Sequence, residues 1–196
     1  MKLNFKNKKQ LLLKLKDILE NKNSIIISGG NSIKDLFRNY KNQIVCDKIL
    51  LSDERIVKKN SNLRNDFFFK NLIKKKIIKT KKFINYEHDE LDNSKVDNFS
   101  EKIKKLKFDY ALLSLGSNGH FASIFRIDNK KDNFYHVKNS PKFPKNRVTV
   151  SLSKISKCKK IIFIASINKK KKEILNFKRF KLIKKLPKSR TCLYYY

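Results

Sequence analysis

The sequence predicts an α/β protein built on an open, mostly parallel, doubly wound sheet with helices on both faces. Short β-branched runs of strand length alternate with amphipathic segments along the chain. All four glycines stand in two clusters, and each cluster directly follows a predicted strand. We find no internal repeat and no flexible Gly/Ser linker, so we expect residues 1–196 to form a single domain.

Each expected strand is a short run rich in Ile, Leu, Val or Phe. The expected strands are 24–28, 48–51, 83–86, 110–115, 147–152 and 160–165, with 191–196 as an edge strand. The expected helices are 11–20, 33–40, 65–75, 97–106 and 169–177, with a further short helix beginning near His120. We assign no element to 133–140. Ligands of such folds bind beyond the carboxyl ends of the strands, which is where both glycine clusters lie.

The chain carries a formal charge of +32, from 49 basic and 17 acidic residues. A basic surface can bind nucleic acid by releasing counterions from phosphates. However, 42 of the basic residues are Lys and only seven are Arg, and they are spread along the whole chain. Proteins that read bases favour Arg, whereas Lys, Asn and Ile all have AT-rich codons. We therefore favour codon bias over a nucleic-acid role, and we expect the field to attract anionic substrates in either case.

The cysteines and the apolar runs indicate a cytoplasmic protein. Cys46, Cys158 and Cys192 are an odd, scattered set, which predicts neither a disulfide framework nor a zinc site. No apolar run approaches the roughly 18 residues that a membrane-spanning helix needs. The first residues lack the pattern of a secretory signal.

Two segments that follow strands could bind an anion. Gly29 and Gly30 stand between a strand and a helix, where backbone can approach a ligand closely and a helix N-terminus attracts negative charge. The pattern is neither GxGxxG nor GxxxxGK, so a tight turn without a ligand stays open. Arg55, in the run 52–55 (Ser-Asp-Glu-Arg), could clamp a phosphate or take part in a surface ion-pair cluster.

His120 is the sharpest candidate for chemistry. It follows the turn 116–119 (Gly-Ser-Asn-Gly) at the end of a strand, where it could exchange protons with a substrate near neutral pH, or be a cap or core histidine. His88 and His136 are interpreted as ordinary polar positions. A proline-stiffened loop brings Arg147 to the start of a strand, and one lysine of 169–172 could face a phosphate while the others are solvated.

These blocks occur in the same order, from Ser24 to Leu175, in the 6-phosphogluconolactonases, and the chain resembles that family. The runs Gly-His-x-Ala-Ser and Pro-Lys-x-Pro-x-x-Arg carry most of the resemblance, supported by the strand-Ser-Gly-Gly turn, the Asp-Glu-Arg followed by Ser61-Asn62, and the late Lys-x-Glu-x-Leu. The resemblance implies the fold of glucosamine-6-phosphate deaminases and ribose-5-phosphate isomerases. It implies hydrolysis of 6-phospho-D-glucono-1,5-lactone to 6-phosphogluconate, in the oxidative pentose phosphate pathway, without a metal or organic cofactor.

The resemblance also implies roles for individual residues. His120 would be the general base on water, and Asn118 would stand beside it at a catalytic position. Arg55, Arg147 and Lys171 would surround the phosphate and the substrate oxygens. The Gly29–Gly30 turn would help to hold the phosphate.

The chain departs from the family pattern at several positions. The family usually has Gly-x-Gly-x-Asp-Gly-His, whereas here Ser114 replaces the first glycine and Asn118 the aspartate. Arg126 stands where a proline usually follows the phenylalanine, the segment 57–61 is shorter than usual, and the whole chain is short for the family. If the aspartate orients the histidine, activity should be reduced.

The alternatives are therefore a catalytically impaired relative, a sugar-phosphate deaminase or isomerase of the same fold, or, from another class, a basic nucleic-acid-binding protein. We expect a monomer or a homodimer.

Overall fold

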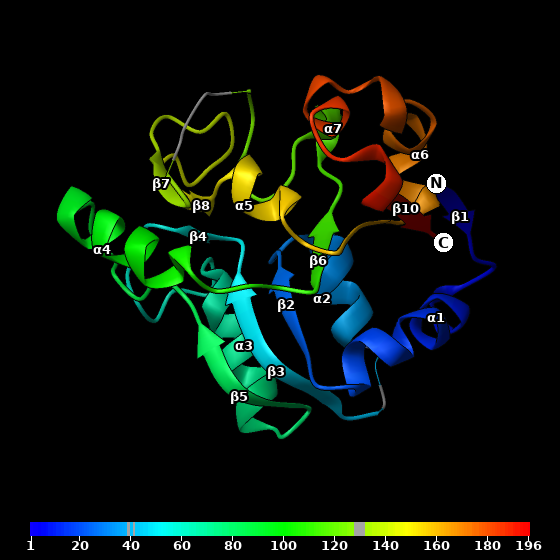
Figure 1. Cartoon of the computed structure of the whole chain (residues 1–196), viewed down its shortest axis with the longest axis horizontal. Coiled ribbons are helices and arrows are strands. Elements are labelled where there is room, and N and C mark those ends of the chain that lie inside the picture. The colour runs from blue at the N-terminus through cyan, green and yellow to red at the C-terminus, as the bar shows by residue number, and fades with distance from the viewer. Residues whose placement is uncertain (39, 41, 128–131) are drawn as a thin grey trace.

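The computed structural model describes residues 1–38, 40, 42–127 and 132–196, and it contains one large sheet and one small sheet surrounded by helices (Figure 1). The large sheet has seven strands, and all of its pairings are parallel. In spatial order they are β1 (Lys2–Asn4), β10 (Thr191–Tyr195), β9 (Lys160–Ala165), β6 (Tyr110–Ser114), β2 (Asn23–Ile27), β3 (Ile44–Leu51) and β5 (Ile78–Ile84). The predicted open parallel sheet is confirmed.

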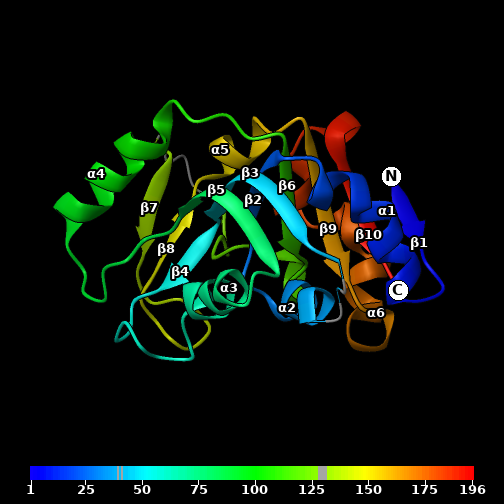
Figure 2. The same cartoon turned by 90° about the horizontal axis from the view of Figure 1, so that it is seen from below.

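Helices cover both faces of the large sheet (Figure 2). One face packs against α1 (Lys8–Glu20), α2 (Asn31–Arg38) and α3 (Asn65–Lys74). The other packs against α4 (Asn93–Lys104), α5 (Leu152–Ser156), α6 (Ile167–Leu175) and α7 (Lys181–Lys184). The expected helix 33–40 begins earlier, at Asn31, and its range includes residue 39, which lies outside the described residues.

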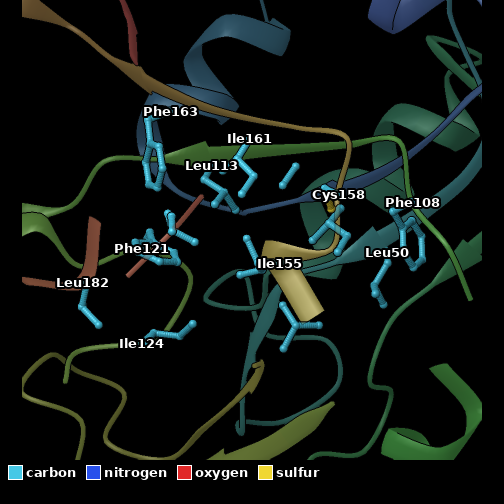
Figure 3. Packing of buried hydrophobic residues seen from close by; sticks show 14 of the residues in the cluster. Leu50, Phe108, Leu113, Phe121, Ile124, Ile155, Cys158, Ile161, Phe163 and Leu182 are labelled. Carbon is cyan, nitrogen blue, oxygen red and sulfur yellow. The ribbon is translucent and has the colours of Figure 1, made fainter. Parts of the chain in front are cut away.

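The central strands are apolar on both sides because each side enters a different core. In β2, Ile26 packs into the core under α4 and α5, while Ile25 and Ile27 pack into the core under α1, α2 and α3. This alternation follows from the two-residue period of a strand. Figure 3 shows the first of these cores, in which Ile155 and Phe163 meet side chains from several strands.

The small sheet is antiparallel and was not predicted. It consists of β4 (Asp53–Arg55), β8 (Arg147–Val150) and β7 (Phe134–Val137), in that order. The expected strand 147–152 is therefore not part of the large sheet. β4 directly follows β3, and the Val150 amide donates to the Ser52 carbonyl, which draws β8 to the end of the large sheet.

Two further expectations were wrong. Residues 191–195 are not an edge strand, because the N-terminal β1 pairs on their outer side. No helix begins at His120, whose backbone is extended (φ −70°, ψ 156°). A single 3₁₀ turn, η1 (Ser117–Gly119), comes before it. Within the described residues, no helix has the length and hydropathy needed to cross a membrane.

Candidate active site

Four of the seven predicted site residues line a cavity of about 270 Å³ at the carboxyl ends of the central strands. Its wall includes the following polar or charged residues: Ser28, Asn31, Ser32, Asp53, Arg55, Ser114, His120, Lys142, Arg147 and Lys170. A larger cavity of about 890 Å³ lies beside α4 and β7, but none of the predicted site residues lines it. We therefore place the site in the smaller cavity.

The first glycine cluster forms the end of the cavity at which α2 begins. Gly30 lines the cavity, and Gly29 lies beside it, outside the wall. A Cβ at Gly29 would lie 2.0 Å from Oδ1 of Asn65, and one at Gly30 would lie 2.5 Å from Cβ and Oγ of Ser114. Both glycines are therefore required for close packing. In the first turn of α2 the amides of Ile33 and Lys34 donate to the carbonyl of Gly30. The amides of Asn31 and Ser32 have no acceptor among the described residues, and together with the helix dipole they favour an anion.

Two arginines stand directly opposite each other on the cavity wall. Arg55 of β4 pairs in register with Arg147 of β8. Arg147 is buried, and its guanidinium donates to the carbonyls of Lys142, Phe143 and Pro144 at 3.0–3.2 Å. Burial, and next the charge of Arg55, lower the pKa of Arg147. Like charges directly opposite each other destabilise a strand pair, so this arrangement favours a bound anion.

The same wall carries one carboxylate, at Asp53. Its oxygens accept hydrogen bonds from the hydroxyls of Ser52 (2.9 Å) and Ser123 (2.8 Å). Ser123 lies three residues after His120, so the bond ties the histidine loop to β4. The same loop is anchored in the core by Phe121, which directly follows His120 and whose ring meets that of Phe163 at 5.1 Å (Figure 3).

The imidazole of His120 is held in one orientation. Its Nδ1 lies 2.5 Å from the carbonyl oxygen of Ser117. A carbonyl can only accept a hydrogen bond, so Nδ1 carries the proton and Nε2 is left as the basic nitrogen. The ring lies over Gly116, where a Cβ would be 2.2 Å from Cε1, and its other neighbour is the ring of Phe125, 4.8 Å away between centroids.

Burial is the main reason why the pKa of His120 lies below its ordinary value. The carbonyl of Ser117 acts in the opposite direction, and the positive charges of Lys142 and Lys170 lower the pKa further. His120 is therefore neutral near pH 7, which is the form that can accept a proton.

The cavity wall includes four of the seven predicted site residues, namely Gly30, Arg55, His120 and Arg147. Asn118 is exposed and outside the wall, with a left-handed backbone (φ 59°).

Lys171 is also exposed and outside the wall, and its neighbour Lys170 lines the cavity instead. The backbone of α6 departs from helical geometry at Lys170 (φ −140°, ψ 26°), the residue that lines the cavity. The four consecutive lysines gave no signal for this kink. Lys142 was also missed, although it stands in the Pro-Lys run that the sequence had singled out.

Comparisons with known proteins identify the family of this chain. The family model described as glucosamine-6-phosphate isomerases/6-phosphogluconolactonase matches residues 4–190. A 6-phosphogluconolactonase of Borreliella burgdorferi is 28% identical over 169 residues, which cover 79% of this chain and 72% of the relative.

Solved structures show the same fold at lower identity. A 6-phosphogluconolactonase from Thermotoga maritima has a TM-score of 0.76 at 19% identity, over 100% of this chain and 98% of that chain. A monomeric glucosamine-6-phosphate deaminase has a TM-score of 0.77 at 15% identity, over 99% and 96%. Because the family model spans nearly the whole chain, this protein belongs to the family of glucosamine-6-phosphate isomerases and 6-phosphogluconolactonases.

Proposed function

We propose that this protein hydrolyses 6-phospho-D-glucono-1,5-lactone to 6-phosphogluconate, with His120 as general base. The observation that carries the proposal is a neutral histidine whose free Nε2 belongs to a cavity walled by two opposed arginines. The family membership and the name of the Borreliella relative support the same reaction. A lactone is an activated ester, so a base and a cationic wall are sufficient chemistry for its hydrolysis.

The reaction begins with proton transfer to His120. Nε2 takes a proton from a water molecule as the water oxygen attacks the lactone carbonyl, which forms a tetrahedral oxyanion. Collapse of this intermediate breaks the bond between the carbonyl carbon and the ring oxygen. The imidazolium returns its proton to the departing oxygen, which leaves a hydroxyl and a carboxylic acid that ionises in water.

The cationic residues bind the two ends of the substrate. The N-terminus of α2, beside Gly30, is suited to the phosphate, because free N–H groups and a helix dipole bind a dianion without side-chain motion. Arg55, Arg147 and Lys170 supply positive charge for the phosphate and for the developing oxyanion. Anchoring the phosphate away from the carbonyl lets its binding energy orient the reacting end.

The setting of this activity is also part of the proposal. We infer a cytoplasmic enzyme that works as a monomer or a homodimer and folds as a single domain. The two cores share the one large sheet, which supports a single domain. The three cysteines are free and buried, which fits a reducing compartment.

The test is loss of freshly generated 6-phosphogluconolactone, measured above its spontaneous hydrolysis in buffer. We expect wild type to accelerate the loss and His120→Ala to abolish the acceleration. His136→Ala is the matched control, because this histidine lies on β7 outside the cavity, and it should retain the activity.

Ammonia release from glucosamine 6-phosphate, assayed in parallel, tests the deaminase alternative. Ammonia release without lactone hydrolysis would replace our proposal with that alternative. If neither substrate reacts faster than in buffer, the protein is an impaired relative and the proposed activity is wrong.

A further inference from the structure

The turn before His120 is closed by its own backbone. The amide of Gly119 donates to the carbonyl of Gly116 (3.2 Å), and the amide of Gly116 donates to the carbonyl of His120 (2.8 Å). Within this turn Asn118 and Gly119 both have left-handed backbones, with φ of 59° and 76°. Two consecutive left-handed residues reverse the chain, which brings the carbonyl of Ser117 back over the ring of His120, at 2.5 Å from Nδ1.

The side chain of Asn118 takes no part in this contact. It is exposed and does not line the cavity. The imidazole contacts the Ser117 carbonyl through Nδ1, lies over Gly116 and faces the ring of Phe125. The described charges that act on the ring come from Lys142, Lys170 and Asp53, and all three line the cavity, which Asn118 does not.

We propose that Asn118 positions His120 through its backbone: its left-handed conformation aims the Ser117 carbonyl at Nδ1 and so fixes Nε2 as the basic nitrogen. Asn and Asp are the non-glycine residues that adopt this conformation most readily, because their short polar side chains tolerate it. A carboxylate at this position is then not required, because an asparagine adopts the same left-handed backbone and aims the Ser117 carbonyl in the same way. This inference rests on the proposed role of His120 as base, and it names a positioning residue for that base.

Three substitutions of Asn118 separate backbone from side chain. Asn118→Gly removes the side chain but keeps access to a left-handed φ, and Asn118→Asp restores a carboxylate. Asn118→Val is strained at this φ because its Cβ is branched. Lys22→Val is the matched control, since Lys22 is also exposed and left-handed (φ 52°) but lies between α1 and β2.

The first measurement is the protonation state of each ring nitrogen of His120, read from side-chain ¹⁵N chemical shifts above its pKa. We expect wild type, Asn118→Gly and Asn118→Asp to carry the proton on Nδ1. We expect Asn118→Val to show a mixture of the two forms, while Lys22→Val stays like wild type. This readout needs no substrate, so it remains decisive even if the lactone is not hydrolysed.

The second measurement is kcat and KM for the lactone. Asn118→Gly and Asn118→Asp should change kcat by no more than about twofold, as surface substitutions do. Asn118→Val should lower kcat on the order of tenfold, given the usual strain of such a backbone, with little change in KM. If Asn118→Val does not fold, Asn118→Gly and Asn118→Asp still show whether the backbone or the side chain of Asn118 is needed. A kcat that falls in Asn118→Gly and rises tenfold in Asn118→Asp, with Nδ1 protonated throughout, would assign the role to the side chain and overturn the inference.

Discussion

Gly116→Ala adds one methyl group beneath the ring of His120 and tests the proposed site most directly. A Cβ at this position would lie 2.2 Å from Cε1, 2.3 Å from Nε2 and 2.6 Å from Nδ1 of His120. The backbone there is extended (φ −86°, ψ 167°), so alanine is not strained by its own dihedral angles. The only large effect of the substitution is therefore on the position of the imidazole.

The size of the effect follows from these distances. Ordinary contacts between heavy atoms lie at about 3.5–4.0 Å, so the ring must move by more than about 1 Å. Such a shift also breaks the bond between Nδ1 and Ser117, which is only 2.5 Å long. A misplacement of about 1 Å can lower an enzymatic rate on the order of 100-fold, and we expect a loss of that size in kcat/KM. The free energy of unfolding should change by no more than about 1 kcal/mol, because Gly→Ala at a compatible φ restricts the unfolded chain.

The assay compares kcat/KM for the lactone in wild type and Gly116→Ala, with urea unfolding and the side-chain ¹⁵N shifts of His120 for each. If the methyl group acts through the ring, these shifts should change together with kcat/KM, because the ring leaves the Ser117 carbonyl. Full activity in Gly116→Ala would refute the position that we assign to the ring. A loss of activity with unchanged ¹⁵N shifts would show that Gly116 acts on catalysis by another route.

Three further perturbations test the charges of the site and of its support. Lys142→Met removes a positive charge that lowers the pKa of His120, so that pKa should rise, and the loss of kcat/KM on acidification should begin at higher pH. An unchanged pH profile would contradict this. Arg147→Met should lower kcat/KM at least about tenfold, since hydrogen bonds to charged groups contribute about 1.5–3 kcal/mol. Equal activity would remove Arg147 from the binding wall. Arg64→Met should lower the free energy of unfolding in urea by about 3–5 kcal/mol, because it removes the described ion-pair partner of the buried Glu54 and leaves Asp66 with Lys70 alone. A loss below about 1 kcal/mol would contradict that view of the pair.

The large sheet could be predicted because its strands carry their own signal. The Ile-rich runs of β2 and β9 are buried on both sides. A short, continuous apolar run of this kind is typical of a strand inside a parallel sheet that is covered on both faces. The small sheet had no comparable signal. β4 is Asp-Glu-Arg, without an apolar residue, and it forms a strand because Asp53 meets Thr149 almost a hundred positions later. Pairing at that separation depends on the fold and not on local propensity.

A site residue could be predicted from the sequence where it follows a strand. It could not be predicted where a local kink in a helix determines which side chain reaches the cavity. Gly30 follows β2, Arg55 lies in β4 just after β3, and His120 follows β6. Parallel strands bring positions at their carboxyl ends together. Lys170 depends instead on a departure from helical geometry inside α6, which four identical side chains cannot encode. The sequence could therefore not show that Lys170, and not Lys171, lines the cavity.

The acidic residues beside Arg55 explain why its charge is directed to the cavity. From sequence, the run 52–55 could have been a surface ion-pair cluster, but Asp53 and Glu54 are both buried. The carboxylate of Glu54 accepts from the amides of Asn65 (2.7 Å) and Asp66 (2.8 Å) at the start of α3, and its described ion pair is with Arg64, at 3.9 Å. Asp53 is occupied by two serine hydroxyls. Arg55 therefore has neither neighbouring acid as an ion-pair partner among the described residues. Its guanidinium donates to the carbonyl of Leu63, and its positive charge lies opposite that of Arg147 on the cavity wall, an arrangement that favours an anion there.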